Sequence, residues 1–241
     1  MAGTLDIETL FDAGAHFGYG RTRRHPSAAP FLFGTKDQTD MFDLTATAQH
    51  LGKAREFVSL LAQKGAQILF VSGKNESKHI MRSAAESAGV PHSTNRWIGG
   101  TLTNFKNIRK RIDRLEKLSA ERESGALEKY TKRERLLLDR EIEELLVRFG
   151  GLVAMRDLPA ALFVVDTRHE DTAVREANQL GIPIIGLASS DCDFASIQYP
   201  IPGNDTSVRS VKLVVDSIAE AYLEGKKHQV PSSKSQTNSD H

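Results

Sequence analysis

The sequence predicts an α/β fold in which a doubly wound parallel sheet carries an inserted antiparallel coiled-coil helical hairpin. Continuous apolar runs at 67–73, 161–166 and 181–187 are typical of parallel strands that are covered on both faces. Amphipathic helical patterns alternate with these runs, as β-α-β units require. Two further helical patterns lie between the first and the second run, within 103–150, and form the insertion.

Composition indicates a soluble globular protein, because 39% of its 241 residues are hydrophobic and 26% are charged. The net charge is only +1, so any surface for nucleic acid must come from segregation of charge along the chain. The single cysteine, Cys192, excludes a disulfide framework and fits a reducing compartment. The sequence starts without a signal-peptide pattern, and no apolar run approaches the ~20 residues of a membrane span, so we expect a cytoplasmic protein.

The elements follow from apolar periodicity and from cap and stop residues. Before the insertion we expect a helix at 1–15 capped by Thr4, a buried strand at 31–34 pairing with 39–44, a helix from Asp43 or Thr45 to Lys64 ended by Gly65, a strand at 67–73 and a helix at 76–87. After it we expect a strand at 161–166, a helix at 170–180, a strand at 181–187, a rigid turn at 199–205 and a last helix from about Asp205 to Glu224, stopped by Gly225.

The insertion reads as two helices of similar length. The first follows the turn at Gly99-Gly100 and carries an apolar stripe, Phe105, Ile108, Ile112, Leu115 and Leu118. The second opens with a capping box, Thr131 to Glu134, and closes at Gly150-Gly151. Facing stripes predict an antiparallel coiled coil. We therefore expect a discontinuous core of 1–102 and 151–225, a hairpin at 103–150 and a disordered tail at 226–241.

The first arm of the hairpin is strongly basic. Only Asp113 and Glu116 oppose its six cations, which are Lys106, Arg109, Lys110, Arg111, Arg114 and Lys117. A solvated helix face is the better interpretation of a charge run alone. The adjoining turn with Asn95, Arg96 and the single Trp97 favours a nucleic-acid surface instead, with Trp97 in the core.

A second cationic segment lies at 16–26, where two glycines, three arginines and two histidines occur without an acid. Arginine forks pair with phosphates, and glycine lets the backbone approach closely. An ordinary surface loop is an equally good interpretation of this composition.

No catalytic set can be assembled from the sequence. Gly73-Lys74 resembles the end of a P-loop but lacks the spacer, the first glycine and the following Ser or Thr. The carboxylates beside Cys192 disfavour a thiolate, so a structural cysteine is indicated. Asp166 ends a strand, where a helix cap or loop carboxylate is the better interpretation. We expect a binding protein and no enzyme. The alternatives are a nucleotide-binding α/β enzyme that uses Gly73-Lys74 and Asp166, and a coiled-coil adaptor without an RNA role.

Several motifs of this sequence resemble those of one protein family and occur in the same order along the chain. They are His16-Phe17-Gly18, Pro30-Phe31-Leu32-Phe33-Gly34, the highly specific block from Asn95 to Phe105 (N-R-W-I-G-G-T-L-T-N-F), Ala161-Leu162-Phe163-Val164-Val165-Asp166, and Ile201-Pro202-Gly203-Asn204-Asp205. Over roughly residues 5–225 the chain resembles the bacterial small-subunit ribosomal protein two, the universal uS-two family. The resemblance implies a flavodoxin-like or Rossmann-like domain with a protruding hairpin. It also implies a structural constituent of the 30S subunit that supports translation on the solvent side, between head and body.

The resemblance names the expected partners: 16S ribosomal RNA (16S rRNA), neighbouring small-subunit proteins and the docked ribosomal protein one. With the charge pattern it gives the expected RNA-binding residues, Arg21, Arg23, Arg24, Asn95, Arg96, Asn104, Lys106, Arg109, Lys110, Arg111 and Arg114.

The chain departs from the family at several positions. Tyr19 replaces a usual His, Arg24-His25-Pro26 replaces Trp-Asn-Pro, and Ser27 and Ala29 replace lysines. Some members hold a metal in a region that matches His169, Asp193 and Asp205. Ser189 stands here for a usual Asp, so we expect no committed metal and no cofactor.

Overall fold

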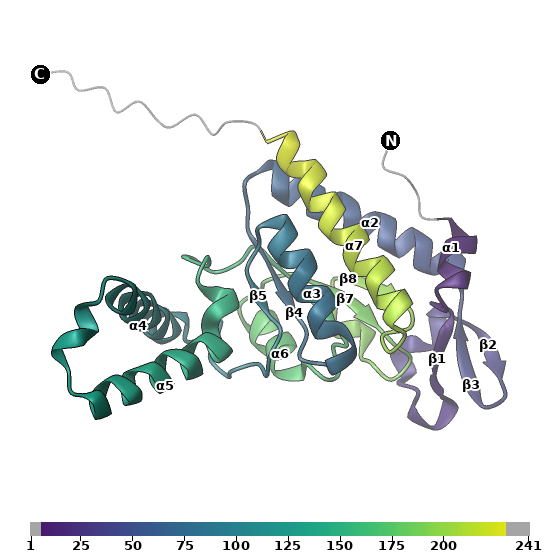
Figure 1. The fold of residues 1–241 in the computed structure, drawn as a ribbon. Coiled ribbons are helices and arrows are strands. Elements are labelled where there is room, and N and C mark those ends of the chain that lie inside the picture. Colours follow the sequence, from purple (N-terminus) through teal and green to yellow (C-terminus); the bar gives the residue numbers. More distant parts are fainter. Residues whose placement is uncertain (1–5, 230–241) are drawn as a thin grey trace, which may run out of the picture.

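The computed structural model describes residues 6–229 (Figure 1). Its centre is a parallel sheet with the strand order β5-β4-β6-β7-β8. These strands are His92–Ser93, Ile68–Val71, Ala161–Val165, Ile184–Ala188 and Tyr199–Pro202. In chain order the arrangement is 2-1-3-4-5, the flavodoxin type of doubly wound sheet. The predicted α/β class is confirmed.

Helices cover both faces of this sheet. One face carries the long helices α2 (Leu44–Gln63) and α7 (Val208–Lys227) together with α3 (Asn75–Ala88). The other face carries the short α6 (Asp171–Gln179) and the root of the hairpin. Because side chains alternate along a strand, neighbouring residues serve different cores: Phe163 packs toward α2 and α7, while Val164 packs toward α6. None of the helices within 6–229 has the length and apolar character of a membrane span.

The strand β8 corrects the expected rigid turn. Its residues pair in parallel with β7, although Pro200 and Pro202 lack an N–H. The sheet tolerates these prolines because β8 is an edge strand, where one side of the backbone needs no partner.

A small antiparallel sheet forms the N-terminal end of the domain. Its order is β1-β3-β2, with β1 at Phe17–Gly20, β3 at Thr39–Phe42 and β2 at Leu32–Lys36. The cationic segment at 16–26, expected to be a loop, is therefore partly a strand. The expected burial of the strand at 31–34 is wrong, because β2 faces solvent and Phe33 is 84% exposed.

The first helix also differs from the expectation. Helix α1 is Ile7–Asp12 and begins after Asp6, while the predicted cap Thr4 lies outside the described residues. Asp43, one of the two predicted starts of the next helix, caps α2 with its carboxylate. The predicted start of the last helix near Asp205 is wrong, because α7 begins at Val208 with Ser207 as its N-cap.

The insertion consists of two helices at one end of the molecule, far from the small sheet (Figure 1). They are α4 (Phe105–Glu123) and α5 (Lys132–Phe149), joined through Ala126–Lys129. The predicted capping box at Thr131 is confirmed. The buried stripe of α4 belongs to the same apolar cluster as the sheet face beside α6, so the hairpin root is continuous with the core. A coiled-coil geometry of the two arms stays a prediction.

The last helix does not stop at Gly225 as expected. Helix α7 continues to Lys227, while the rest of the predicted tail, 230–241, lies outside the described residues. Gly225 is buried against α2, where a Cβ would press on Ser59 O and lie 2.7 Å from Ala62 Cβ. The glycine therefore serves close helix packing.

We predict that Gly225→Ala lowers the free energy of unfolding by about 1–3 kcal/mol, because the added methyl overpacks the α2–α7 contact. Gly52→Ala is the matched control: it lies inside α2 with open space around it, so it should raise stability by about 0.5–1 kcal/mol. Urea unfolding measures both variants. Equal effects of the two substitutions would contradict this role of Gly225.

Candidate nucleic-acid interface

One buried carboxylate, Glu176 of α6, organises the loop between β5 and α4. Its two oxygens accept five hydrogen bonds of 2.8–3.1 Å, from Trp97 Nε1, Gly100 N, Leu102 N, Thr103 N and Thr103 Oγ1. Burial raises the pKa of Glu176, but these hydrogen bonds outweigh burial and hold the pKa below its ordinary value. Gly100 has φ +88°, which lets the loop fold around the carboxylate.

The loop also joins the core to the second arm of the hairpin. Asn95 Nδ2 donates to Val147 O of α5 at 2.6 Å, and Trp97 is buried, as predicted, at the hairpin root. Gly151 lies so close to strand β5 that a Cβ there would be 2.8 Å from His92 Cδ2 and closer still to His92 O. Asn95 is thus held in place against α5, the second arm of the hairpin.

Arg109 does not face outward as the helix pattern suggested. Its guanidinium bonds Asp113 at 2.7 Å, Glu116, and the carbonyls of Val153 and Met155 at 3.2 and 3.1 Å. Its side chain is only 14% exposed. The carbonyls come from the segment after α5, so Arg109 stabilises the junction of hairpin and core.

Arg114 is likewise engaged inside the hairpin. Its guanidinium makes a bidentate pair with Glu141 of α5, with Nε and Nη2 at 3.1 and 3.3 Å from the two oxygens. This pair connects the two arms and reduces the positive charge that the first arm presents.

Of the remaining cations of the first arm, Lys117 lies 3.9 Å from Glu121 Oε1, whereas the other three are free among the described residues. Lys106, Lys110 and Arg111 are exposed, and none of them has a hydrogen bond or ion pair within 6–229. Lys110 and Arg111 border a pocket of about 500 Å³, lined further by Ile98, Gly99, Asn104, Asn107, Ile108, Arg148 and Phe149. Its lining holds three cations, two amides and an apolar floor, and no carboxylate. Such a pocket suits an anionic ligand with a flat apolar part.

The N-terminal arginines, Arg21, Arg23 and Arg24, lie at the end of the domain away from the hairpin (Figure 1). Arg24 is a structural residue, because its Nε donates at 2.7 Å to the fully buried Asp40. Arg23 is half exposed and bonds Asp191 at 3.0 Å. Arg21 is exposed without an ion pair among the described residues, and Arg96 of the root loop is exposed in the same way.

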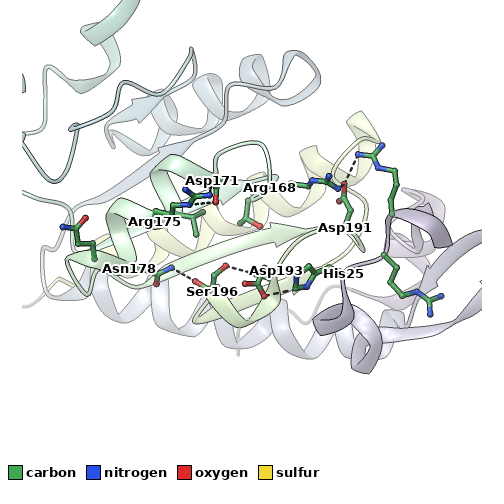
Figure 2. A pocket seen from close by; sticks show the side chains of 13 residues that line it. His25, Arg168, Asp171, Arg175, Asn178, Asp191, Asp193 and Ser196 are labelled. Atoms are coloured by element: carbon green, nitrogen blue, oxygen red, sulfur yellow. Dashed lines mark hydrogen bonds and ion pairs between the residues drawn. The ribbon is translucent and has the colours of Figure 1, made fainter.

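A second pocket, of about 880 Å³, opens between this arginine segment and α6 (Figure 2). Figure 2 shows Arg168 directed at Asp191, Arg175 beside Asp171, and Asp193 beside His25. The pocket lies at the carboxyl ends of β6 and β7, which is the edge where doubly wound folds bind ligands.

The sequence profile of the family described as Ribosomal protein S2 matches residues 10–225. The chain belongs to the ribosomal protein S2 family. It is 36% identical over 221 residues to the small ribosomal subunit protein uS2 of Maridesulfovibrio salexigens, covering 92% of this chain and 85% of the relative. It is 40% identical over 222 residues to the protein of the same name from Coprothermobacter proteolyticus, covering 92% and 83%. This is a family of structural proteins of the small ribosomal subunit, and not of enzymes.

In the crevice between β4 and β6, a side chain of the protein occupies the position where a ligand could bind. In a doubly wound sheet, a phosphate would bind the backbone N–H groups after the first strand. Here Gly73 N donates at 2.7 Å to Glu170 Oε1, which also contacts His169 Nδ1 at 2.8 Å. A carboxylate of the protein itself thus takes the place of an anion, and this disfavours the nucleotide-binding alternative.

Lys74, the second residue of that alternative, is also engaged. Its ammonium lies 3.0 Å from Asp166 Oδ2 and 3.5 Å from Asp205 Oδ1. Burial alone would lower the pKa of Lys74, but the charges of Asp205 and Asp166 raise it. Asp166 bonds His169 N at 2.9 Å, which agrees with the predicted loop carboxylate.

The residues that match a metal region of the family do not fit a metal as they stand. Within 6–229, the potential ligand atoms that lie within 4.8 Å of one another belong to Asp166, Cys192 and Asp205. Burial, and then the charges of the two aspartates, raises the pKa of the Cys192 thiol to about 12, so it stays protonated. The Lys74 ammonium already supplies a positive charge beside both carboxylates. His169 and Asp193, the other predicted candidates, lie outside this cluster.

Sequence reasoning missed Glu176, Arg168 and Asp191. The sequence could have revealed Glu176, because this charged residue lies on the apolar stripe of α6 beside Ala173 and Ala177. A charge at such a position needs a buried partner. Arg168 and Asp191 follow different strands and meet only in the folded sheet, so no local pattern marks them.

We predict that Glu176→Gln lowers the free energy of unfolding at pH 7 by about 2–4 kcal/mol. The amide removes the charge and turns a donor toward backbone N–H groups that then lack an acceptor. Urea unfolding measures the loss, and a variant as stable as the wild type would contradict the assigned network.

We predict that the difference in stability between the wild type and Glu176→Gln depends on pH. Because the pKa of Glu176 is lowered in the folded state, its contribution is present above its ordinary value of about 4.5 and is lost as pH falls through the folded-state pKa. The stability difference between wild type and Glu176→Gln should therefore shrink below about pH 4.5. A difference that stays constant from pH 7 to pH 3 would refute the lowered pKa.

Proposed function

We propose that this protein binds 16S rRNA in the small ribosomal subunit through the basic face of α4 and the loop that precedes it. The observation that carries the proposal is a set of three cations without partners within 6–229, Lys106, Lys110 and Arg111. Two of them, Lys110 and Arg111, line a pocket without carboxylates. Lysine and arginine side chains without internal partners neutralise RNA phosphates and release counterions. The small-subunit names of its relatives agree with such a partner.

The pocket beside these cations supports a contact with one unstacked nucleotide. Its floor is apolar, from Ile98 and Phe149, and the amides of Asn104 and Asn107 stand at its edge. Amides read base edges, and unpaired RNA regions offer bases that leave the stack. Arg148 adds a third cation from the second arm.

We keep three further residues as predicted RNA contacts. Arg21 and Arg96 are exposed cations, and Asn95 is held in place in the loop before α4. For Arg109, Arg114 and Arg24 we propose an indirect part, because their guanidiniums bond residues of the protein itself. They hold the hairpin and the N-terminal segment in the shape that presents the free cations.

We further propose that the protein docks ribosomal protein one and contacts neighbouring small-subunit proteins. This proposal rests on the family resemblance. Small subunits depleted of this chain should carry less ribosomal protein one on a sucrose gradient, and adding the chain back should restore it. Equal amounts on depleted and restored subunits would refute the docking.

We predict that the double variant Lys110→Ala, Arg111→Ala weakens binding to 16S rRNA and lowers the salt slope of log K by about 2, since each phosphate contact contributes about 1. The control Lys53→Ala, Lys212→Ala removes the same charge from α2 and α7 on the other face of the sheet. Affinity is measured by filter binding between 50 and 300 mM salt.

The control should keep the wild-type slope. If both double variants shift the slope equally, the attraction comes from overall charge and not from this face of α4. If neither shifts it, the proposed RNA contact is wrong.

A further inference from the structure

Two exposed guanidiniums share one buried carboxylate oxygen at the mouth of the larger pocket. Arg23 Nη2 and Arg168 Nη1 lie 3.0 and 2.9 Å from the same atom, Asp191 Oδ2. Asp191 is 3% exposed, whereas the two arginine side chains are 54% and 55% exposed. Figure 2 shows Arg168 directed at this carboxylate. The carboxylate is therefore a fixed support, and the guanidiniums reach solvent.

One carboxylate cannot neutralise two guanidiniums, so one positive charge remains at this point. Within the described residues, the bond to Asp191 is the single hydrogen bond of each guanidinium. A guanidinium has five N–H donors in a rigid fork, so most of them stay available to a ligand. Two such forks held side by side match the oxygens of one phosphate group.

Both arginines are held by the structure around them. The Arg23 guanidinium lies 4.2 Å from the centre of the Tyr19 ring, a cation–π contact. Tyr19 N donates to Ser190 Oγ at 2.9 Å, which ties this segment to the loop of Asp191. Arg168 lies three residues after the end of β6, and its bond to Asp191 holds its guanidinium. The site is therefore largely formed before a ligand arrives, which lowers the entropic cost of binding.

The other charges of this pocket have partners of their own. Arg175 pairs with Asp171, the residue four positions earlier on α6. Asp193 accepts from Ala195 N at 3.0 Å and lies 3.9 Å from His25, away from Asp191 in Figure 2. The unneutralised positive charge thus lies between Arg23 and Arg168.

We propose that Arg23 and Arg168, positioned by Asp191, bind one phosphate group of the RNA backbone. This inference rests on the proposed RNA function. It adds a contact at the end of the domain away from the hairpin, so the bound RNA reaches both ends of the α/β core (Figure 1). Asp191 acts as a positioning residue that touches the arginines and not the RNA.

The test measures binding of the full chain to 16S rRNA as a function of salt. Arg23→Ala and Arg168→Ala should each weaken binding and lower the salt slope by about 1. Arg23→Lys and Arg168→Lys should keep the slope and still bind more weakly, because lysine lacks the fork. Arg175→Ala, in the same pocket but paired with Asp171, should change affinity less than about twofold.

Asp191→Asn separates positioning from charge. It keeps both arginines and removes one negative charge, so a merely neutralising Asp191 predicts tighter RNA binding in the variant. Positioning predicts weaker binding with an unchanged slope. Thermal unfolding of each variant confirms that it is folded, and the arginine variants test the site even if Asp191→Asn does not fold.

The outcomes distinguish this inference from the proposed function. If the Lys110, Arg111 double variant lowers the slope and the Arg23 and Arg168 variants do not, this inference fails alone. If none of them changes binding, the proposed function fails. Saturable binding of ATP to the wild type that is lost in Arg23→Ala and Arg168→Ala would assign the site to a free nucleotide and overturn the RNA assignment.

Discussion

The carboxylate of Glu176 fixes the loop that leads into the basic helix α4. A buried charge is costly to desolvate, and here five hydrogen bonds offset that cost. Hydrogen bonds to a charged group contribute about 1.5–3 kcal/mol each, so five of them exceed the several kcal/mol of desolvation. The loop they hold leads directly into α4. The direction of the basic helix is thus set by a buried residue on α6, outside the surface proposed to bind RNA.

A common theme is that carboxylates of the protein occupy the places where a doubly wound fold could hold a ligand. Glu170 accepts from Gly73 N at the sheet crevice, and Lys74 is held between Asp166 and Asp205. These internal pairs occupy the carboxyl ends of the central strands, where a ligand would otherwise bind. Binding capacity is therefore left to the surface, where Lys106, Lys110 and Arg111 lack partners within the described part of the chain. This distribution fits a structural ribosomal protein better than an enzyme built on the same sheet.

What the sequence predicts well is governed by local pattern. The parallel strands, the long helices, the capping box at Thr131 and the buried Trp97 all follow from periodicity or from short-range chemistry. The errors arise from contacts between distant segments. Arg109 and Arg114 look like free cations on a helix, but carbonyls after α5 and Glu141 engage them. Gly225 looks like a helix stop, and its use in packing against α2 becomes visible only in three dimensions.

Amide hydrogen exchange of wild type and Glu176→Gln tests this account most directly. If the carboxylate organises the root loop, the amides of Gly100, Leu102 and Thr103 exchange slowly in the wild type and much faster in the variant. The first turn of α4 should lose protection with them, while β4 and β6 stay protected. Unchanged protection of these three amides in the folded variant would show that the loop holds its shape without Glu176, and would contradict the account.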